Sequence, residues 1–210
     1  MQFDQIRELI EEGIAIERQT GMLRQAVINL ANANGRSLTE LKVQKVINFV
    51  TEYIEHAPAL MKQIEEAATT PGARHDVRPI LDATEDYFLV SNDTIPDHLG
   101  LVGLVDDAYL AHSLMQAISD RYKSQSGESL LPFEVRADNA FIRRLIGEPF
   151  ASILDDRVLA TLGSPRVRQN IEQMLMALRQ MNLSSGPDPV WGNVRASEIA
   201  DARLGAMGVF

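Results

Sequence analysis

Apolar residues recur at steps of three and four along most of this 210-residue chain, and that spacing keeps them on one face of an α-helix. The clearest stripe runs from Val43 through Val46, Val50 and Ile54. No segment of the sequence shows sustained two-residue alternation flanked by turn residues, the pattern that indicates a β-strand. The periodicity therefore predicts an all-α protein, a multi-helix bundle of about eight helices.

Glycine, proline and polar clusters separate the expected helices. Gly21 favours a break in the first helix, and Pro58 is expected to kink or split the second. Ser37, with Glu40 three residues later, has the spacing of a capping box and predicts the start of the second helix. Ser164-Pro165 is typical of a helix start. The expected helices span about 4–34, 37–68, 74–90, 107–122, 135–146, 150–162 and 164–181, with a short last helix at 196–204.

These elements suggest three parts. Residues 1–70 are expected to form an N-terminal helical hairpin, because a short connection joins two long apolar stripes. Residues 73–183 are expected to form a core with a central helix–turn–helix, followed by further helices. Residues 184–210 are expected to be a linker and a C-terminal tail that packs on the core, with Trp191 as its anchor.

Charge and composition narrow the function classes. The net charge of −9 disfavours nucleic-acid binding and docking on anionic lipid, which both need clustered positive charge. The chain has no cysteine, which excludes disulfides, thiolate catalysis and cysteine-ligated metals. There is no apolar run long enough for an integral membrane helix, and the N-terminus is acidic and amphipathic, unlike a secretory signal. We therefore expect a cytoplasmic protein.

One stretch of the chain, 93–107, concentrates special residues and reads D-T-I-P-D-H-L-G-L-V-G-L-V-D-D. Asp93 and Asp97 can accept N–H groups that a turn leaves free, and the proline fixes one φ angle. The two glycines permit positive φ or a close helix approach. Asp106 and Asp107 are expected at the start of the helix 107–122, where carboxylates cap free N–H groups and favour the positive end of the helix dipole.

This stretch resembles the YkvA-like family, a small bacterial domain with a pattern close to D-L-I-P-D-x-I-P-x-L-G-x-L-D-D. The resemblance covers about residues 81–118. The chain departs from the pattern at His98, where the family has an apolar residue, and at Gly100, where it has a second proline. The family has no established reaction, so the resemblance implies a fold element rather than a mechanism. The matching residues are Asp93, Ile95, Pro96, Asp97, Gly103, Leu104, Asp106 and Asp107.

The motif residues Asp93, Pro96, Asp97, Gly103, Asp106 and Asp107 allow two interpretations. In the first, the carboxylates cap helices and shape a tight turn. In the second, Asp93, Asp97, Asp106 and Asp107, with Asp86 or Glu85 on the preceding helix, hold a divalent cation such as Mg²⁺ or Ca²⁺. His98 and His112 flank the carboxylates and could then act as a base or a ligand. Both interpretations stay open from the sequence.

The sequence contains no G-x-S-x-G elbow, no Walker A loop and no G-x-G-x-x-G, so we assign no catalytic residue and no cofactor. The leading hypothesis is a non-enzymatic protein that binds another protein, with a second copy of itself as one candidate and the N-terminal hairpin as its contact arm. The alternative is a metal-dependent enzyme, such as a hydrolase, that uses Mg²⁺, Mn²⁺ or Ca²⁺ at the aspartate cluster. Peripheral membrane binding is a third hypothesis.

Overall fold

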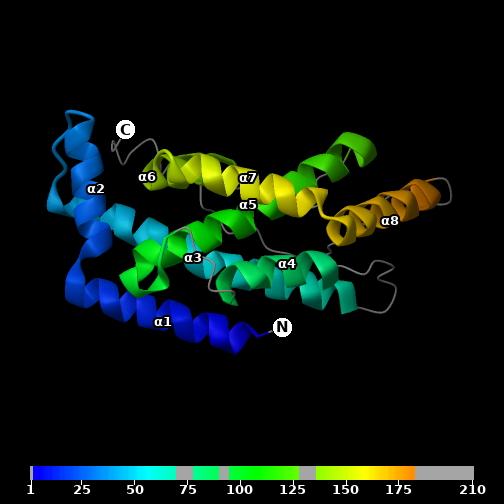
Figure 1. Cartoon of the computed structure of the whole chain (residues 1–210), viewed down its shortest axis with the longest axis horizontal. Coiled ribbons are helices and arrows are strands. Elements are labelled where there is room, and N and C mark those ends of the chain that lie inside the picture. Colours follow the sequence, from blue (N-terminus) through cyan, green and yellow to red (C-terminus); the bar gives the residue numbers. More distant parts are fainter. Residues whose placement is uncertain (1, 70–77, 90–94, 128–135, 183–210) are drawn as a thin grey trace.

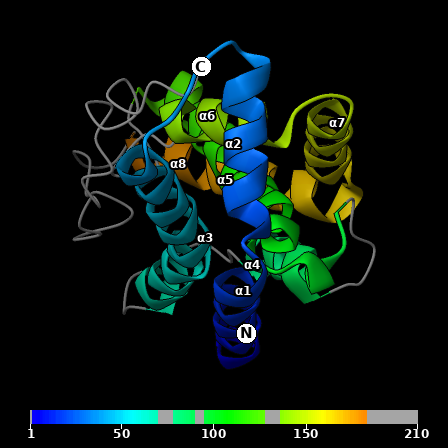
Figure 2. The same cartoon turned by 90° about the vertical axis from the view of Figure 1, so that its left-hand side faces the viewer.

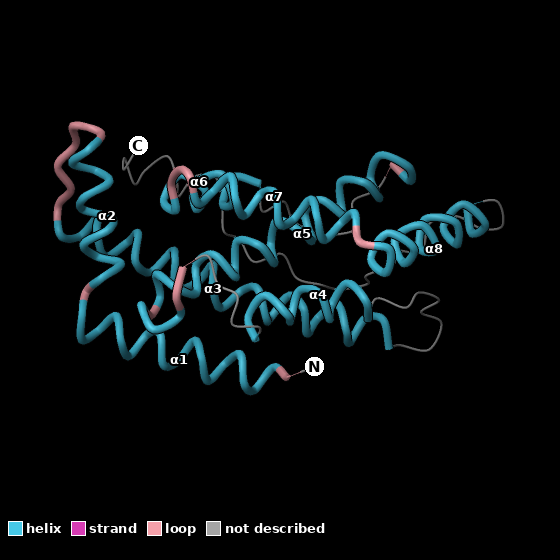
Figure 3. Tube along the Cα trace, in the orientation of Figure 1, coloured by secondary structure: helices cyan, strands magenta, loops and turns pink. Residues whose placement is uncertain are grey.

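The computed structural model describes residues 2–69, 78–89, 95–127 and 136–182. Within these ranges the chain forms eight packed α-helices and one 3₁₀ turn and contains no strand, which confirms the all-α prediction (Figure 3). The predicted last helix at 196–204 and the proposed anchor Trp191 lie outside the described residues. The helices are α1 (Phe3–Thr20), α2 (Met22–Ala33), α3 (Glu40–Thr69), α4 (Arg78–Leu89), α5 (Leu101–Ser126), α6 (Arg136–Ile146), α7 (Phe150–Gly163) and α8 (Pro165–Asn182), with the turn η1 (Asp97–Leu99) before α5.

Helix α5 is the centre of the bundle. It packs against each of the seven other α-helices of the described ranges, and the view in Figure 2 shows them arranged around it. In Figure 1, α1 and α3 run in opposite directions along one side, with α2 connecting them at one end. Between Leu101 and Ser119, every residue of α5 is buried except Val102, Ser113 and Ala117. A helix covered on all sides needs apolar residues around its whole circumference, and α5 lacks a single dominant apolar stripe for this reason.

The predicted break at Gly21 is confirmed. Gly21 has φ +64° and ends α1, and α2 begins at the next residue. The carboxylate of Glu17 then accepts the N–H groups of Leu23 at 2.8 Å and Arg24 at 3.1 Å, so it caps α2 across the bend. Glu17 is buried, and its cap holds the two helices at a fixed corner.

Helix α3 differs from its predicted start, and it is not split at Pro58. It begins at Glu40, so Ser37 lies too far upstream to cap it and the capping-box prediction is wrong. Pro58 lies inside one continuous helix of 30 residues and does not split it. The apolar stripe of α3 faces α1, α2 and α5 and is buried, so it fills the core of this protein rather than serving a partner. Its buried members include Val43, Val46, Val50, Tyr53, Ile54, Ala57 and Met61.

The start of α5 also corrects a prediction. The helix begins at Leu101, six residues before the expected start at Asp107. Gly100 precedes it with φ +69° and ψ −134°, a conformation that only glycine adopts readily. A Cβ at Gly100 would lie 2.8 Å from Cγ2 of Ile16 and 3.1 Å from the carbonyl oxygen of Gly13 on α1. Glycine is therefore required here both by backbone conformation and by the close approach of α1.

This close approach gives a stability prediction. We expect Gly100→Ala to lower the free energy of unfolding by about 2–4 kcal/mol, because it adds a steric clash with α1 to the strain of positive φ. Gly127→Ala is the matched control, since Gly127 has φ +81° but a methyl group there would meet nothing within 4 Å. That control should lose only about 1 kcal/mol in urea denaturation. Equal losses in the two variants would contradict the packing argument.

Candidate functional site

Helix α5 carries a polar stripe inside the bundle. Tyr109, His112, Gln116 and Ser119 recur at steps of three and four, so they share one face of the helix, and all four are buried. Because buried polar groups need hydrogen-bond partners, this stripe determines which side chains must meet α5 from the neighbouring helices. We call these four residues, with Ser113 and Asp120 on the same face, the polar seam.

Helices α6 and α7 supply partners for both ends of the seam. At one end, the hydroxyl of Tyr109 donates to Oδ1 of Asp155 at 2.6 Å, and Nε of Arg143 donates to Oδ2 of the same carboxylate at 2.9 Å. Burial and the bond to Asp155 raise the pKa of Tyr109 to about 12. At the other end, Asp120 accepts from Gln116 at 2.8 Å and from Arg136 at 2.7 Å. The seam thus ties α5 to α6 and α7.

The middle of the seam contains a pair of histidines. Nε2 of His112 lies 3.0 Å from the carbonyl oxygen of Tyr53 on α3, so it donates to that oxygen. The ring of His112 stacks on that of His56, with 5.3 Å between centroids and 12° between planes. His112 is fully buried, and its Nδ1 has no hydrogen-bond partner among the described residues. Burial, and then the neighbouring His56, lower the pKa of His112 from 6.5 to about 3, so the ring is neutral.

The two adjacent aspartates of the motif lie in the second turn of α5, not in its first turn as expected. Asp106 is fully buried, and its Oδ2 accepts the N–H of Ile95 at 3.2 Å, across the turn that precedes the helix. Asp107 is 1% exposed, and neither carboxylate is without a partner. Asp106 therefore binds a main-chain amide, as the capping interpretation requires, although that amide belongs to the preceding turn rather than to the helix.

The remaining motif residues are only partly described. Pro96 is exposed, and its carbonyl accepts the N–H of Leu99 at 3.0 Å. Gly103 is buried in the first turn of α5. Asp93 lies outside the described residues, as does the side chain of Asp97. No group of three or more potential metal ligands occurs in the parts of the chain that are described, and the proposed metal set stays a prediction because two of its four carboxylates are outside them.

The two histidines that flank the motif lie in different environments. His98 is exposed on the turn η1, whereas His112 is buried in the middle of α5 and bonded to α3. On the preceding helix, Glu85 accepts the N–H of Gln2 at the start of the chain. His112 therefore contacts α3, and Glu85 contacts Gln2, the residue that precedes α1.

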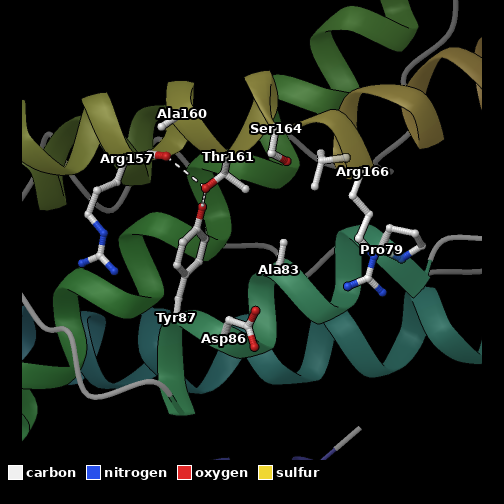
Figure 4. Close-up of a pocket in the computed structure, with 10 residues that line it drawn as sticks. Pro79, Ala83, Asp86, Tyr87, Arg157, Ala160, Thr161, Ser164 and Arg166 are labelled. Atoms are coloured by element: carbon white, nitrogen blue, oxygen red, sulfur yellow. Dashed lines mark hydrogen bonds between the residues drawn. The ribbon is translucent and has the colours of Figure 1, made fainter.

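An open groove lies on the surface between α4 and the junction of α7 with α8 (Figure 4). Its volume is about 560 Å³. Tyr87 crosses the groove, and its hydroxyl donates to Oγ1 of Thr161 at 2.7 Å, which in turn donates to the carbonyl of Arg157 at 3.0 Å. The lining residues include Ala83, Asp86 and Tyr87 on α4, Arg157 and Ala160 on α7, and Arg166 on α8.

The groove contains charges of both signs. The guanidinium of Arg166 pairs with Asp82 at 2.5 Å. The guanidinium carbon of Arg157 lies 6.0 Å from the centre of the Tyr87 ring. In Figure 4 the two arginines lie at opposite ends of the groove and Asp86 lies between them on the α4 wall. Asp86 is exposed and forms no ion pair with any described residue.

Neither the polar seam nor the groove has a strong signal in the sequence. The seam has the spacing of a helix face, and such a polar face normally contacts solvent, so the sequence does not predict its contacts with α3, α6 and α7. The groove is lined by Ala83, Ala160 and other residues that lie on separate helices. No local sequence pattern shows that these helices pack side by side. One sequence signal does exist, because α7 has apolar residues on both of its faces. It buries Leu154 and Val158 and exposes Ile153.

Comparison with protein-family models, curated proteins and solved structures finds no match of any of the three kinds. The resemblance to the YkvA-like family therefore stays a prediction. Every helix in the described ranges is too short or too polar to cross a bilayer.

The Asp106 bond predicts a measurable contribution to stability. Asp106→Ala should lower the free energy of unfolding by about 1–3 kcal/mol, because it removes a buried acceptor of the Ile95 N–H. Asp106→Asn keeps an oxygen at the same position and should lose less in the same urea titration. If alanine and asparagine were equally destabilising, the main-chain bond would not be the important interaction of this side chain.

The neutral His112 predicts a pH dependence. Its folded-state pKa lies below its unfolded value, so the unfolded chain binds more protons as the pH falls below about 6.5, and stability declines towards pH 3. Between pH 6.5 and 5, where carboxylates are still largely ionised, His112 should account for a loss of about 1.5 kcal/mol. His112→Gln keeps a donor for the Tyr53 carbonyl but cannot titrate. The free energy of unfolding of the variant, measured by denaturation, should therefore depend less on pH in this window than that of the wild type. An equal pH dependence in the two proteins would contradict burial of a neutral ring.

Proposed function

We propose that this protein is non-enzymatic and binds another protein, and that the groove between α4 and α7 receives a helix of that partner. The observation that carries the proposal is that α7, which lines the groove with Arg157, Ala160 and Thr161, also has exposed apolar side chains. Phe150 and Ile153 are 43% and 46% exposed. Exposed apolar surface next to a groove is characteristic of sites where proteins associate.

The spacing along α7 supports a helical occupant. Phe150, Ile153, Arg157, Ala160 and Ser164 recur at steps of three and four, so they lie along one side of α7 and its junction with α8. This side of the helix is about 20 Å long at 1.5 Å per residue, and its second half, from Arg157 to Ser164, lines the groove. Such a length matches about four turns of a partner helix rather than a small molecule.

The width of the groove supports the same proposal. Ala83 on α4 and Ala160 on α7 line opposite walls, and their small side chains leave room for the side chains of a third helix. The groove is open along its length rather than closed. Small-molecule sites usually bury most of their ligand's surface, whereas helix-binding grooves leave one side of the helix in solvent. The buried stripe of α3 no longer supports the N-terminal hairpin as the contact arm, so α7 takes that place in the proposal.

The test fills the groove. Ala160→Trp should reduce recovery of the partner by at least about tenfold, because the indole occupies the space that the partner helix needs. Ala15→Trp places the same side chain at an exposed position on α1 and is the control. The measurement is chemical cross-linking of the tagged full chain in its native cells, with circular dichroism to confirm that both variants fold. A partner recovered equally by both variants would contradict the proposal.

Two further assays on the same variants separate the candidate partners. Light scattering of the purified chain identifies a second copy as the partner if a dimer of the wild type is lost in Ala160→Trp. Flotation with neutral and anionic vesicles detects lipid binding. If the wild type floats with vesicles and Ala160→Trp does not, the groove binds a membrane rather than a protein.

A further inference from the structure

We propose that Trp191 of this chain docks in the groove between α4 and α7, so that the protein covers its own binding surface until a partner displaces the tail. The docking needs only this chain, whereas its regulatory role rests on the proposed function. Trp191 itself lies outside the described residues, and the sequence predicts that it anchors the tail 184–210 on the core. The groove and the length of the tail support this place for the anchor.

The walls of the groove suit a flat aromatic ring. Ala83 on α4 and Ala160 on α7 line opposite walls with small side chains, and Pro79 adds further apolar surface (Figure 4). A volume of about 560 Å³ is within the range of sites that hold a drug-sized ligand, about 300–1,000 Å³, so the groove has ample room for an indole. Burial of the indole there removes a large apolar surface from water.

The arginines of the groove favour an aromatic occupant over a charged one. Arg166 pairs with Asp82 at 2.5 Å, and this bond uses N–H groups that lie in the plane of the guanidinium. The face of the guanidinium can still stack on a ring, and the Arg166 side chain is 67% exposed. Tryptophan is the aromatic residue that best accepts a cation over its face. An acidic occupant would compete with Asp82 for Arg166, and a basic one would meet both Arg157 and Arg166.

The polar groups of the groove can satisfy the indole N–H. A tryptophan that docks in a protein usually donates this group to an acceptor. The carboxylate of Asp86 is exposed on the α4 wall, between the two arginines in Figure 4. The hydroxyl of Ser164 on the other side of the groove is a second possible acceptor. The groove therefore matches both the apolar body and the polar edge of a tryptophan.

The length of the chain after α8 matches the distance back to the groove. Helix α8 begins beside the groove, which Arg166 and Val167 line, and ends at Asn182. From Arg166 to Asn182 the helix is about 24 Å long at 1.5 Å per residue. The segment from Asn182 to Trp191 can span about 30 Å at 3.3 Å per residue. A tail that turns back after α8 therefore brings Trp191 to the groove, and the covalent link gives it a high effective concentration there.

Trp191 is the only tryptophan of the chain, so its fluorescence reports the docking directly. In the full-length wild type its emission should be blue-shifted, and acrylamide should quench it less than in the chain unfolded in urea. Ala160→Phe fills the groove without adding a tryptophan, and it should make Trp191 as accessible to acrylamide as in the unfolded chain. Ala15→Phe, at an exposed position on α1, is the control and should leave the quenching unchanged. Circular dichroism confirms that both variants fold.

Two fluorescence results would overturn the proposal. A tryptophan that acrylamide reaches fully in the wild type is not docked, and a protected tryptophan that Ala160→Phe does not expose is docked elsewhere.

A second measurement does not depend on filling the groove. The chain has no cysteine, so Ala83→Cys with Val190→Cys gives a protein with only two thiols. Mild oxidation should join them in an intramolecular disulfide, because docking of Trp191 brings its neighbour close to the α4 wall. Ala15→Cys with Val190→Cys is the control and should not form the bond. Equal yields from the two pairs would contradict docking in the groove.

Recovery of the native partner separates failure of this proposal from failure of the proposed function. Trp191→Ala should raise the recovery, because the apparent affinity grows with the fraction of chains whose groove is open. If Trp191→Ala leaves the recovery unchanged while Ala160→Trp abolishes it, the groove binds a partner and the regulatory role is wrong. If Trp191 is docked but Ala160→Trp does not affect the recovery, the groove holds the tail and the proposed function is wrong.

Discussion

The enclosure of α5 by the seven other helices of the described chain is the constraint on which the rest of the structure depends. A helix without a solvent-facing side must either be apolar throughout or find partners inside the protein for each polar group it carries. Helix α5 carries several, and their bonds reach three different neighbours. His112 holds the backbone of α3 at Tyr53 inside the protein, Tyr109 holds α7 through the part-buried Asp155, and at the exposed end of the seam Asp120 holds α6 through Arg136. The positions of these helices are therefore specified by directional bonds as well as by apolar packing, which is non-directional.

The sequence predicts most helices of this protein and fewer of their boundaries. Where strong local signals exist, the prediction agrees with the structure: α6 and α7 are separated at Gly147, α8 begins at Pro165, and α1 ends at Gly21. The start of α5 was missed because the residues after Gly100 are apolar and include a second glycine, so they resembled a turn. Tertiary burial overrides this weak local preference, since α5 is covered on every side from its first turn. The polar seam was missed for the opposite reason, because its spacing is that of an ordinary solvent-facing surface.

Gly100 also shows how the resembling motif is used in this chain. The family pattern has proline at this position, but a proline ring fixes φ near −65°, and Gly100 has φ +69°. The turn before α5 in this protein is therefore one that proline could not form. It lets Gly13 and Ile16 of α1 approach the start of the central helix more closely than any residue with a Cβ would allow. The bond from the N–H of Ile95 to Asp106 closes the same turn from the other side, so the region is a packing joint between α1 and α5.

The buried seam and the surface groove meet in α7. His112 is fully buried in the middle of the seam, whereas the partners at its ends, Asp155 and Asp120, are partly exposed. Asp155 accepts one bond from Tyr109 and another from Arg143, and these two bonds fix the rotation of α7 about its own axis. That rotation determines which side of α7 faces outward and hence where the groove wall lies relative to α4. A groove wall held in place before binding loses less conformational entropy when a partner docks. These two part-buried bonds thus help to fix the position of the groove wall relative to α4.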